Sequence, residues 1–396
     1  MKGSGDVAVP GPRAAKVEQN DRLLRSAAIA ILAEEGWNGL STRVLTARCG
    51  LTTGAFYARF ENVVAFIDEL WDEILLDAMI GPVDEAIAAV EEGDRDRFIG
   101  KLDSLAHPSP EILAATELLQ AAMVEPELEP IIAPSVTAFL ERRTRPSAEV
   151  SVEEATVAAA VSFVGLGLAH LAKRSWVADL DVRPDLGRYF DALREPAEPL
   201  ATPTEVIAEY LYVYPFDTGD ERLDRLMQAT AIEIGERGYR RATVQRICRT
   251  AGLSTGFMMS RFKTKLDLFA TITEMMWGRG LDQVTVHLAE MSERLGPAMA
   301  EAMTWREMQN PVITRVQVLA TETSRMMGFI PRIAELVESQ EQAFFSTLSS
   351  GGPTAFVLTE FALGSGLTLA VWFSPEIRDL PYHCVTAPLV ASAPGL

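Results

Sequence analysis

The chain has 396 residues, of which 36 are Lys or Arg and 55 are Asp or Glu, so its formal net charge is −19 although 48% of its residues are hydrophobic. The apolar content excludes an intrinsically disordered chain, and the net charge excludes a uniformly basic nucleic-acid coat protein. The length suggests about two to three domains. Cys49, Cys248 and Cys384 are far apart and odd in number, which predicts a reducing cytoplasm and no disulfide framework.

Neither a membrane span nor a signal segment is expected. The most apolar stretch, residues 155–172, is interrupted by Ser162 and His170, and we expect it to fall short of the roughly 20 residues that cross a bilayer. Residues 1–13 are rich in Gly and Pro and contain no apolar run. We therefore expect a cytoplasmic protein with no membrane partner.

The sequence contains an internal repeat. At a shift of 202 positions, residues 24–60 align with residues 226–262 without a gap, and ten of the 37 positions are identical. The identical residues of the first copy are Leu24, Ala27, Glu34, Gly36, Gly50, Leu51, Thr53, Gly54, Arg59 and Phe60. A weaker match relates residues 164–169 to 363–368 at a shift of 199. The chain is therefore expected to be two copies of a unit of about 200 residues.

The first copy begins with three predicted helices. Apolar residues at helical spacing predict a helix from Leu23 that stops at Gly36, because glycine is preferred just past a helix end. Ser41 is an N-cap candidate for a second helix, and Thr52 for a short third helix over residues 53–59.

The second copy repeats this pattern. Helices are expected over residues 223–236, 243–250 and 255–261, with Thr243 and Ser254 as caps. Two short helices joined by a glycine-containing turn are typical of a helix-turn-helix. Strand signals are nearly absent, so the fold class expected is all-α.

A helix-turn-helix places its second helix in the major groove of DNA while hydroxyls, amides and cations hold the phosphates. The local charge agrees with this role. Residues 20–60 hold five Arg and three acidic residues, and residues 222–262 hold eight Arg and three acidic residues, which leaves −26 for the rest of the chain. The pattern favours DNA attraction at these two segments of an acidic protein.

These segments resemble the DNA-binding domain of the TetR family of transcriptional regulators. The resemblance rests on a glycine–aromatic stop, a hydroxyl residue opening the next helix, a Gly-Leu turn followed by Ser or Thr and Thr-Gly, and Arg-Phe at the end. In this chain the motif runs from Gly36-Trp37 to Arg59-Phe60 and from Gly238-Tyr239 to Arg261-Phe262, followed by Lys263 and Lys265. The resemblance implies a non-enzymatic regulator without a cofactor, with a helical ligand-binding and dimerisation domain after each helix-turn-helix.

Two tandem TetR-like units are therefore expected. The predicted divisions are a flexible tail at 1–19, helix-turn-helix domains at 20–68 and 217–270, and helical regulatory domains at 69–216 and 271–396. The family forms a four-helix bundle between two regulatory domains, and the candidates here are 152–173 with 204–213 and 354–373 with 381–391. Small residues would let the first and third of these helices approach closely, namely Ala158, Ala159, Gly165, Gly167, Gly364 and Gly366; packing within each domain is the alternative.

The residues expected at a DNA interface are Ser41, Thr52, Thr53, Gly54, Tyr57, Arg59, Thr243, Ser254, Thr255, Gly256, Phe257, Arg261, Lys263 and Lys265. Several have a second interpretation. The hydroxyl residues cap helices whether or not DNA is bound, Tyr57 could pack at the edge of the core, and a cation at position 59 or 261 also suits the end of a helix. The glycines 54 and 256 suggest close backbone approach, either to DNA or to the preceding helix.

The two copies differ where the family contacts DNA. The first has Val63 where the family has a phosphate-binding lysine, kept as Lys265 in the second. The second has Met259 where the family has a tyrosine, kept as Tyr57 in the first. The positions expected to be exposed also differ, with Ala55, Phe56 and Ala58 in one copy against Phe257, Met258 and Ser260 in the other. Either the two copies bind different DNA sequences, or one has lost its DNA affinity.

No catalytic or metal-binding pattern is found in the sequence. The four histidines share no ligand spacing with cysteines or acidic residues: His107, His170, His287 and His383. The second regulatory region is rich in methionine, which fills cores and also lines adaptable apolar pockets. A pocket for an apolar effector is a hypothesis for four residues there: Met303, Trp305, Met326 and Phe329.

We therefore expect a sequence-specific DNA-binding regulator that acts as a single-chain pseudo-dimer, and a repressor is favoured over an activator. Its partners would be a non-palindromic double-stranded DNA operator and an apolar small-molecule effector that releases it. The alternative is a helical ligand- or protein-binding module with one or both DNA-binding copies degenerate.

Overall fold

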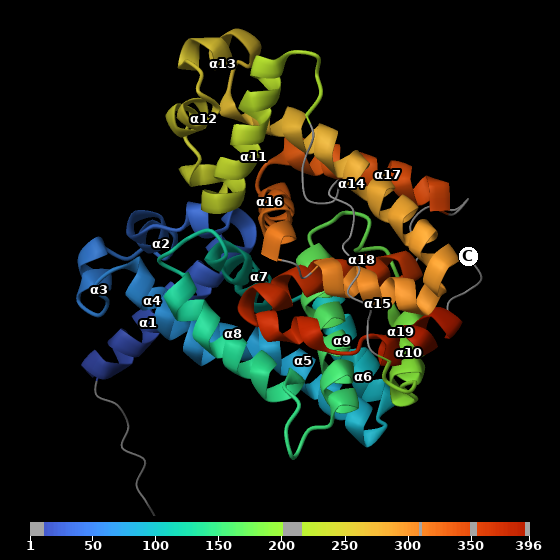
Figure 1. The fold of residues 1–396 in the computed structure, drawn as a ribbon. Helices are drawn as coiled ribbons and strands as arrows, with labels where there is room; N and C mark the ends of the chain where they lie inside the picture. The colour runs from blue at the N-terminus through green and yellow to red at the C-terminus, as the bar shows by residue number, and fades with distance from the viewer. Residues whose placement is uncertain (1–11, 201–215, 309–310, 349–354, 393–396) are drawn as a thin grey trace, which may run out of the picture.

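The computed structural model describes residues 12–200, 216–308, 311–348 and 355–392, and within these ranges it contains helices and no strand (Figure 1). The helices of the first half are α1 (Pro12–Glu35), α2 (Thr42–Arg48), α3 (Thr53–Tyr57), α4 (Val63–Leu70), α5 (Leu76–Glu92), α6 (Arg95–Ala106), α7 (Pro110–Ala122), α8 (Glu129–Thr144), α9 (Val152–Leu171) and α10 (Arg183–Arg194). Those of the second are α11 (Glu221–Arg241), α12 (Val244–Ala251), α13 (Thr255–Arg261), α14 (Lys265–Leu295), α15 (Pro297–Met308), α16 (Pro311–Met327), α17 (Pro331–Leu348), α18 (Ala355–Phe373) and α19 (His383–Ser392). The all-α expectation is confirmed.

The observed helix ends differ from the expected ones by up to two residues in the heads, and by more at the start of α1. Helix α1 begins at Pro12, inside the segment expected as a flexible tail, and proline suits a first helical position because its missing N–H needs no partner there. Helix α3 ends at Tyr57, two residues early. Gly238 lies inside the bounds of α11, but its φ of 73° breaks the helix where the stop was predicted. The helix expected over 204–213 lies outside the described residues.

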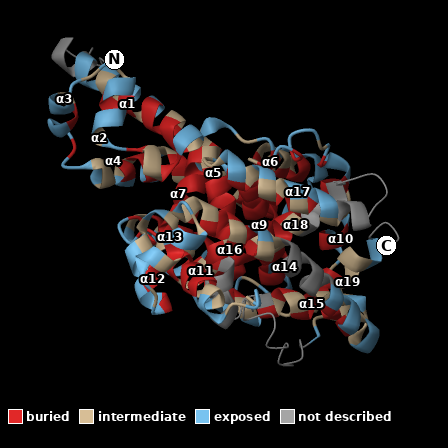
Figure 2. Ribbon diagram, turned by 90° about the horizontal axis from the view of Figure 1, so that it is seen from above, coloured by how far each residue is buried: buried red, intermediate tan, exposed pale blue. Residues whose placement is uncertain are grey.

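We call α1–α4 the first head, and α11–α13 with the start of α14 the second head. Both heads meet the remaining helices, the body, close to α7 and α16 (Figure 2). In the first half, a π-helical turn, Trp71–Leu75, joins α4 to α5, and α14 runs from the second head into the body. The divisions expected after residues 68 and 270 thus fall inside continuous helical segments, which connect each head to the body.

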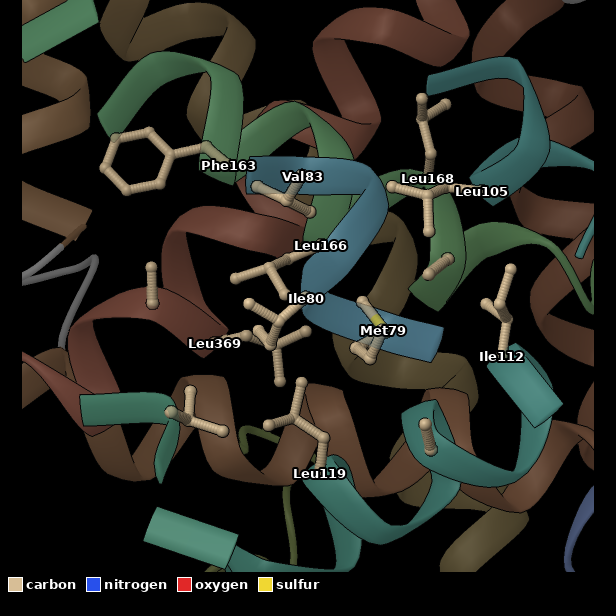
Figure 3. Close-up of a cluster of buried hydrophobic side chains, with 14 of the residues drawn as sticks. Met79, Ile80, Val83, Leu105, Ile112, Leu119, Phe163, Leu166, Leu168 and Leu369 are labelled. Atoms are coloured by element: carbon tan, nitrogen blue, oxygen red, sulfur yellow. The ribbon is translucent and has the colours of Figure 1, made fainter. Parts of the chain in front are cut away.

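One hydrophobic core contains residues from both halves. Met79, Ile80 and Val83 of α5 lie near Phe163 and Leu166 of α9 (Figure 3). The same core takes in Leu369 of α18 and other buried residues of α15 and α19. The second head has a smaller core of its own, shared with α16 and α17. The two regulatory regions therefore do not fold as separate bodies in the part of the chain that is described.

Helices α9 and α18 form the closest contact between the halves. A Cβ atom added to Gly167 would overlap the carbonyl oxygen of Ala362, and one added to Gly366 would overlap that of Phe163. Both glycines thus let backbone meet backbone, as small residues do wherever helices cross closely. Gly165 instead faces Val83 of its own half. The predicted close approach between the halves is confirmed for two of the small residues.

Three of the four helices expected around this contact are described, and the fourth, over 204–213, lies outside the described residues. Helix α19 was predicted as 381–391 and lies beside α9, α10 and α15. Its counterpart in the first half is α10, which packs on α18 and α19. Helix α10 begins at Arg183-Pro184, and proline is favoured in the first turn of a helix. Among the described residues, α9, α10, α18 and α19 pack around this contact.

Helix α9 is long and apolar enough to cross a membrane by length and composition, so the expectation that this stretch is too short was wrong. Of its most apolar window, 78% is buried inside the protein. The helix therefore occupies the position of a core helix, covered by α5, α6, α8 and α18.

The close contact predicts the effect of adding a methyl group. Gly366→Ala should lower the free energy of unfolding by about 1–3 kcal/mol or more, because the Phe163 carbonyl cannot move aside as a side chain would. Gly100→Ala in α6 is the control, since nothing lies within 4 Å of its added Cβ. The control should stabilise the protein by up to about 1 kcal/mol through helix propensity. Urea unfolding measures both, and equal effects would contradict the contact.

Candidate nucleic-acid interface

The turn between the two short helices has the same backbone geometry in both heads. Gly50 has φ of 67° and Gly252 has φ of 66°, a left-handed conformation that glycine adopts without strain. The N–H of Leu51 donates to the carbonyl of Thr46 at 2.9 Å, and the N–H of Leu253 donates to that of Cys248 at 2.8 Å. These donors and acceptors are each 202 positions apart, so the two turns are equivalent bond for bond.

Four exposed hydroxyl residues cap the helices of the two heads as expected. Ser41 and Thr243 accept from the N–H of Val44 and Arg246, each at 3.3 Å. Thr52 and Ser254 accept from the N–H of residues 55 and 257, each at 3.2 Å. The hydroxyls start α2, α3, α12 and α13, and their outward positions leave them accessible to a phosphate.

The outer face of each third helix is open. Thr53, Gly54 and Tyr57 are exposed on α3, and Thr255, Gly256 and Met259 occupy the equivalent exposed positions of α13. The exposed fractions of Tyr57 and Met259 are 58% and 53%, so Tyr57 does not belong to the core. A Cβ added at either glycine would meet, within 4 Å, just the cap hydroxyl at 3.8 Å. Close approach to the preceding helix does not explain these glycines.

Two positions expected to be exposed are buried. Phe56 and Met258 are both fully inaccessible. Phe56 lies one helical turn before Phe60, and residues four apart share a face. Its ring centroid is 5.4 Å from that of Phe60 and 5.8 Å from that of Phe66. These side chains hold α3 and α13 on their heads and are unable to read bases.

The arginines at the end of the third helices bind carboxylates of their own heads. Arg59 donates from Nε to Asp21 at 2.8 Å and also contacts Glu69. Arg261 donates to Asp220 at 2.9 Å. Asp21 lies within α1 and Asp220 caps α11, so each pair joins the end of the third helix to the first helix of its head. A phosphate would have to compete with these acidic residues.

The expected interface of the second head also includes Phe257, Lys263 and Lys265, which have no counterparts in the expected interface of the first head. Phe257 is half-buried, and the guanidinium of Arg222 lies 4.3 Å from its ring centroid. Lys263 is exposed. Lys265 is half-buried, and its ammonium donates to the Tyr239 carbonyl at 2.5 Å and lies 4.1 Å from the Tyr239 ring centroid.

Burial lowers the pKa of Lys265, while nearby Glu322 raises it. Lys265 thus ties the start of α14 to the end of the first helix of its head. The resemblance implies a free, phosphate-binding lysine at position 265, whereas in the structure the Lys265 ammonium contacts Tyr239.

Sequence reasoning assigned no role to three arginines on the second helices. Arg43 of α2, and Arg246 and Arg249 of α12, are exposed. Among the described residues none of the three forms an ion pair. These three arginines were included in the charge totals of the two segments. Their exposure could have been predicted, because the apolar residues at helical spacing on the same helices define the buried face.

The four residues of the hypothetical effector pocket lie in three different clusters. Met303 packs with Met291, and Trp305 lies 6.0 Å from the Phe163 ring centroid within the common core. Met326 is buried in the core of the second head, and Phe329 packs at its edge. Trp305 also donates to Glu301 at 2.6 Å. The structure does not bring these four side chains together.

Comparison with known protein families identifies both heads. The model described as "Bacterial regulatory proteins, tetR family" matches residues 24–70 and again residues 226–272. Both matches span the cap, turn and third helix of one head and end in the helix that enters the body. No curated protein sequence matches the chain.

Substitution of the exposed glycines Gly54 and Gly256 should affect DNA binding without lowering the stability of the fold. Gly54→Ala and Gly256→Ala should leave the fold intact, or stabilise it by up to about 1 kcal/mol, because their Cβ atoms would face open space. Each should weaken DNA binding if the backbone of the third helix lies against DNA. Fluorescence anisotropy with a DNA duplex and thermal unfolding measure the two effects. Unchanged binding in both variants would remove the glycines from the interface.

Proposed function

Because the chain belongs to the tetR family of bacterial regulatory proteins through two copies of its DNA-binding domain, we propose that one chain regulates transcription as an intramolecular pseudo-dimer. The observation that carries this proposal is the α9–α18 contact. Two regulatory regions of one chain meet there backbone to backbone, at Gly167 and Gly366, where two separate chains would otherwise pair. A single chain thereby supplies both heads.

Several further contacts between the halves support this role for the bundle. The ring centroid of Phe163 lies 5.9 Å from that of Tyr382 and 6.0 Å from that of Trp305. The Thr137 hydroxyl donates to the Phe373 carbonyl at 2.7 Å. Arg174 and Glu341 form a buried ion pair at 3.0 Å. These contacts support pairing of the two regulatory regions within one chain.

The proposed operator is a duplex with two unequal half-sites. The turns dock α3 and α13 in the same way, but the two helices present different side chains at the equivalent exposed position. Tyr57 offers a hydroxyl that bonds a phosphate or a base edge, while Met259 offers an apolar contact such as that with a thymine methyl. The half-sites should then differ in sequence and keep a fixed spacing.

Release by an apolar effector completes the proposed repressor cycle. An effector that binds more tightly to a conformation in which the separation of the heads does not fit DNA would shift the population away from the operator-bound state. The binding site is proposed for the body, with Met303, Trp305, Met326 and Phe329 as separate candidate positions. Their distribution over three clusters favours binding by one cluster at a time.

The operator is tested by selecting bound sequences from a random DNA pool. The expected consensus has two different half-sites, centred about one helical turn of 34–36 Å apart or a multiple of it. Met259→Tyr should make the half-sites more alike, with the exposed Ser260→Ala as the control. Two equal inverted half-sites for the parent protein would contradict the proposal. A single half-site would instead favour the alternative, in which one head is degenerate.

A further inference from the structure

Two glutamates of the body hold the two heads in the same way. Glu117 of α7 accepts from the N–H of Trp37 at 2.8 Å, and Glu322 of α16 accepts from the N–H of Tyr239 at 2.6 Å. Both N–H groups directly follow the positive-φ glycine that ends the first helix of a head. Each head is therefore attached to the body by a charge-assisted hydrogen bond from its own half.

One arginine joins these two glutamates. Arg325 donates from Nη1 to Glu117 at 2.7 Å and from Nε to Glu322 at 2.7 Å. All three side chains are about 1% exposed. Burial lowers the pKa of Arg325, but the two carboxylates outweigh burial and hold the pKa above the ordinary value, so the guanidinium stays charged. We call Arg325, Glu117 and Glu322 the triad.

The attachments also cross between the halves. A Cβ atom at Gly36 of the first head would approach Phe329 of the second half within 2.6 Å, and one at Gly238 of the second head would approach Val124 of the first half within 3.0 Å. Each head thus rests on both α7 and α16 or on the turns that follow them. A shift of α7 against α16 would displace both heads.

The triad depends on a difference between the two halves. The sequences Ala115-Thr116-Glu117 and Ala320-Thr321-Glu322 match at a shift of 205, and the same shift places Gln120 opposite Arg325. Gln120 is buried and pairs with His170 at 2.8 Å. Burial, with a smaller effect of Arg174, lowers the pKa of His170 to about 3, so this pair adds no charge at neutral pH.

Two copies of the first half would bring together two Glu117 carboxylates without an arginine. Two copies of the second half would duplicate the arginine, and both guanidinium groups would meet at the same buried place. The unequal halves supply one arginine to two carboxylates. Lys173 of the first half, whose ammonium lies 4.3 Å from the Phe329 ring centroid, brings a second positive charge to this region.

We propose that Arg325 is a positioning residue that fixes the separation and orientation of the two heads, and thereby the half-site spacing that the protein accepts. The effect on spacing rests on the proposed function. The effect on head separation is a property of the protein without DNA. The Arg325 guanidinium binds both glutamates and so connects α7 to α16. If neutral side chains replaced the three charged ones, the hydrogen bonds that attach the two heads would no longer be connected to each other.

A neutral version of the triad separates positioning from folding. Removing Arg325 alone would leave two buried carboxylates facing each other, which is strongly destabilising. The triple variant Glu117→Gln, Glu322→Gln and Arg325→Met removes all three charges, and each glutamine oxygen can still accept from Trp37 or Tyr239. Replacing a buried charge cluster by neutral groups is often nearly neutral for stability.

Pulsed electron–electron double resonance measures the separation directly. Spin labels at Arg43→Cys and Gln245→Cys occupy equivalent exposed positions on α2 and α12, in a background in which Cys49 is replaced by alanine. The parent should give one narrow distance distribution. The triple variant should give a shifted distribution or one roughly twofold wider, because the two attachments are no longer joined.

The matched control is the pair Arg143→Met and Asp84→Asn, which removes a partly buried ion pair within the first half. It should leave the distribution unchanged. An unchanged distribution in a folded triple variant would overturn the proposal. If that variant does not fold, Arg325→Lys replaces it, since an ammonium keeps the charge but lacks the fork that reaches both carboxylates. A parent-like distribution for Arg325→Lys would also overturn the proposal.

DNA binding provides a second readout. Against a selected operator and duplexes with one base pair added or removed between the half-sites, the parent should discriminate by about tenfold or more. The triple variant should lose most of this discrimination. Failure of the parent to bind any duplex would contradict the proposed function and leave the distance measurement to decide the role of Arg325.

Discussion

The arrangement of the protein depends on the contact between α9 and α18. At Gly167 and Gly366 the backbones of the two helices touch, and no side chain fits between them. This contact fixes the two halves against each other and forms the centre of the common core. The placement of the heads builds on this contact, since each head continues into the body through one helical segment, α4–α5 or α14, and is attached to it by Glu117 or Glu322.

The two heads share their backbone and differ in their surface. Equivalent glycines, caps and turn hydrogen bonds preserve the docking geometry, because these features determine how the third helix projects. The exposed positions are under no such constraint, and Tyr57 and Met259 have diverged there. The same division appears in the body, where matching glutamates hold the heads while Gln120 and Arg325 differ. Duplication within one chain permits such differences, whereas a homodimer must present identical surfaces.

Local patterns predicted the heads almost completely. Caps, stop glycines and apolar spacing placed the short helices within a few residues, and the small residues indicated where α9 and α18 meet. The burial of Phe56 was missed although its spacing from Phe60 indicated it. The DNA contacts of Arg59, Arg261 and Lys265 stay predictions. Their bonds to Asp21, Asp220 and Tyr239 were not predicted, because these partners become neighbours once the head is folded. The triad gave no local signal, since its glutamates repeat at a shift of 205 and not 202.

The stoichiometry of the protein on DNA tests the central claim most directly. Native mass spectrometry of the protein bound to its selected operator counts the chains in each complex. The pseudo-dimer predicts one chain on one duplex that carries both half-sites, with the free protein a monomer at the same concentration. Two chains on each operator, with a free protein that is an obligate dimer, would contradict the account.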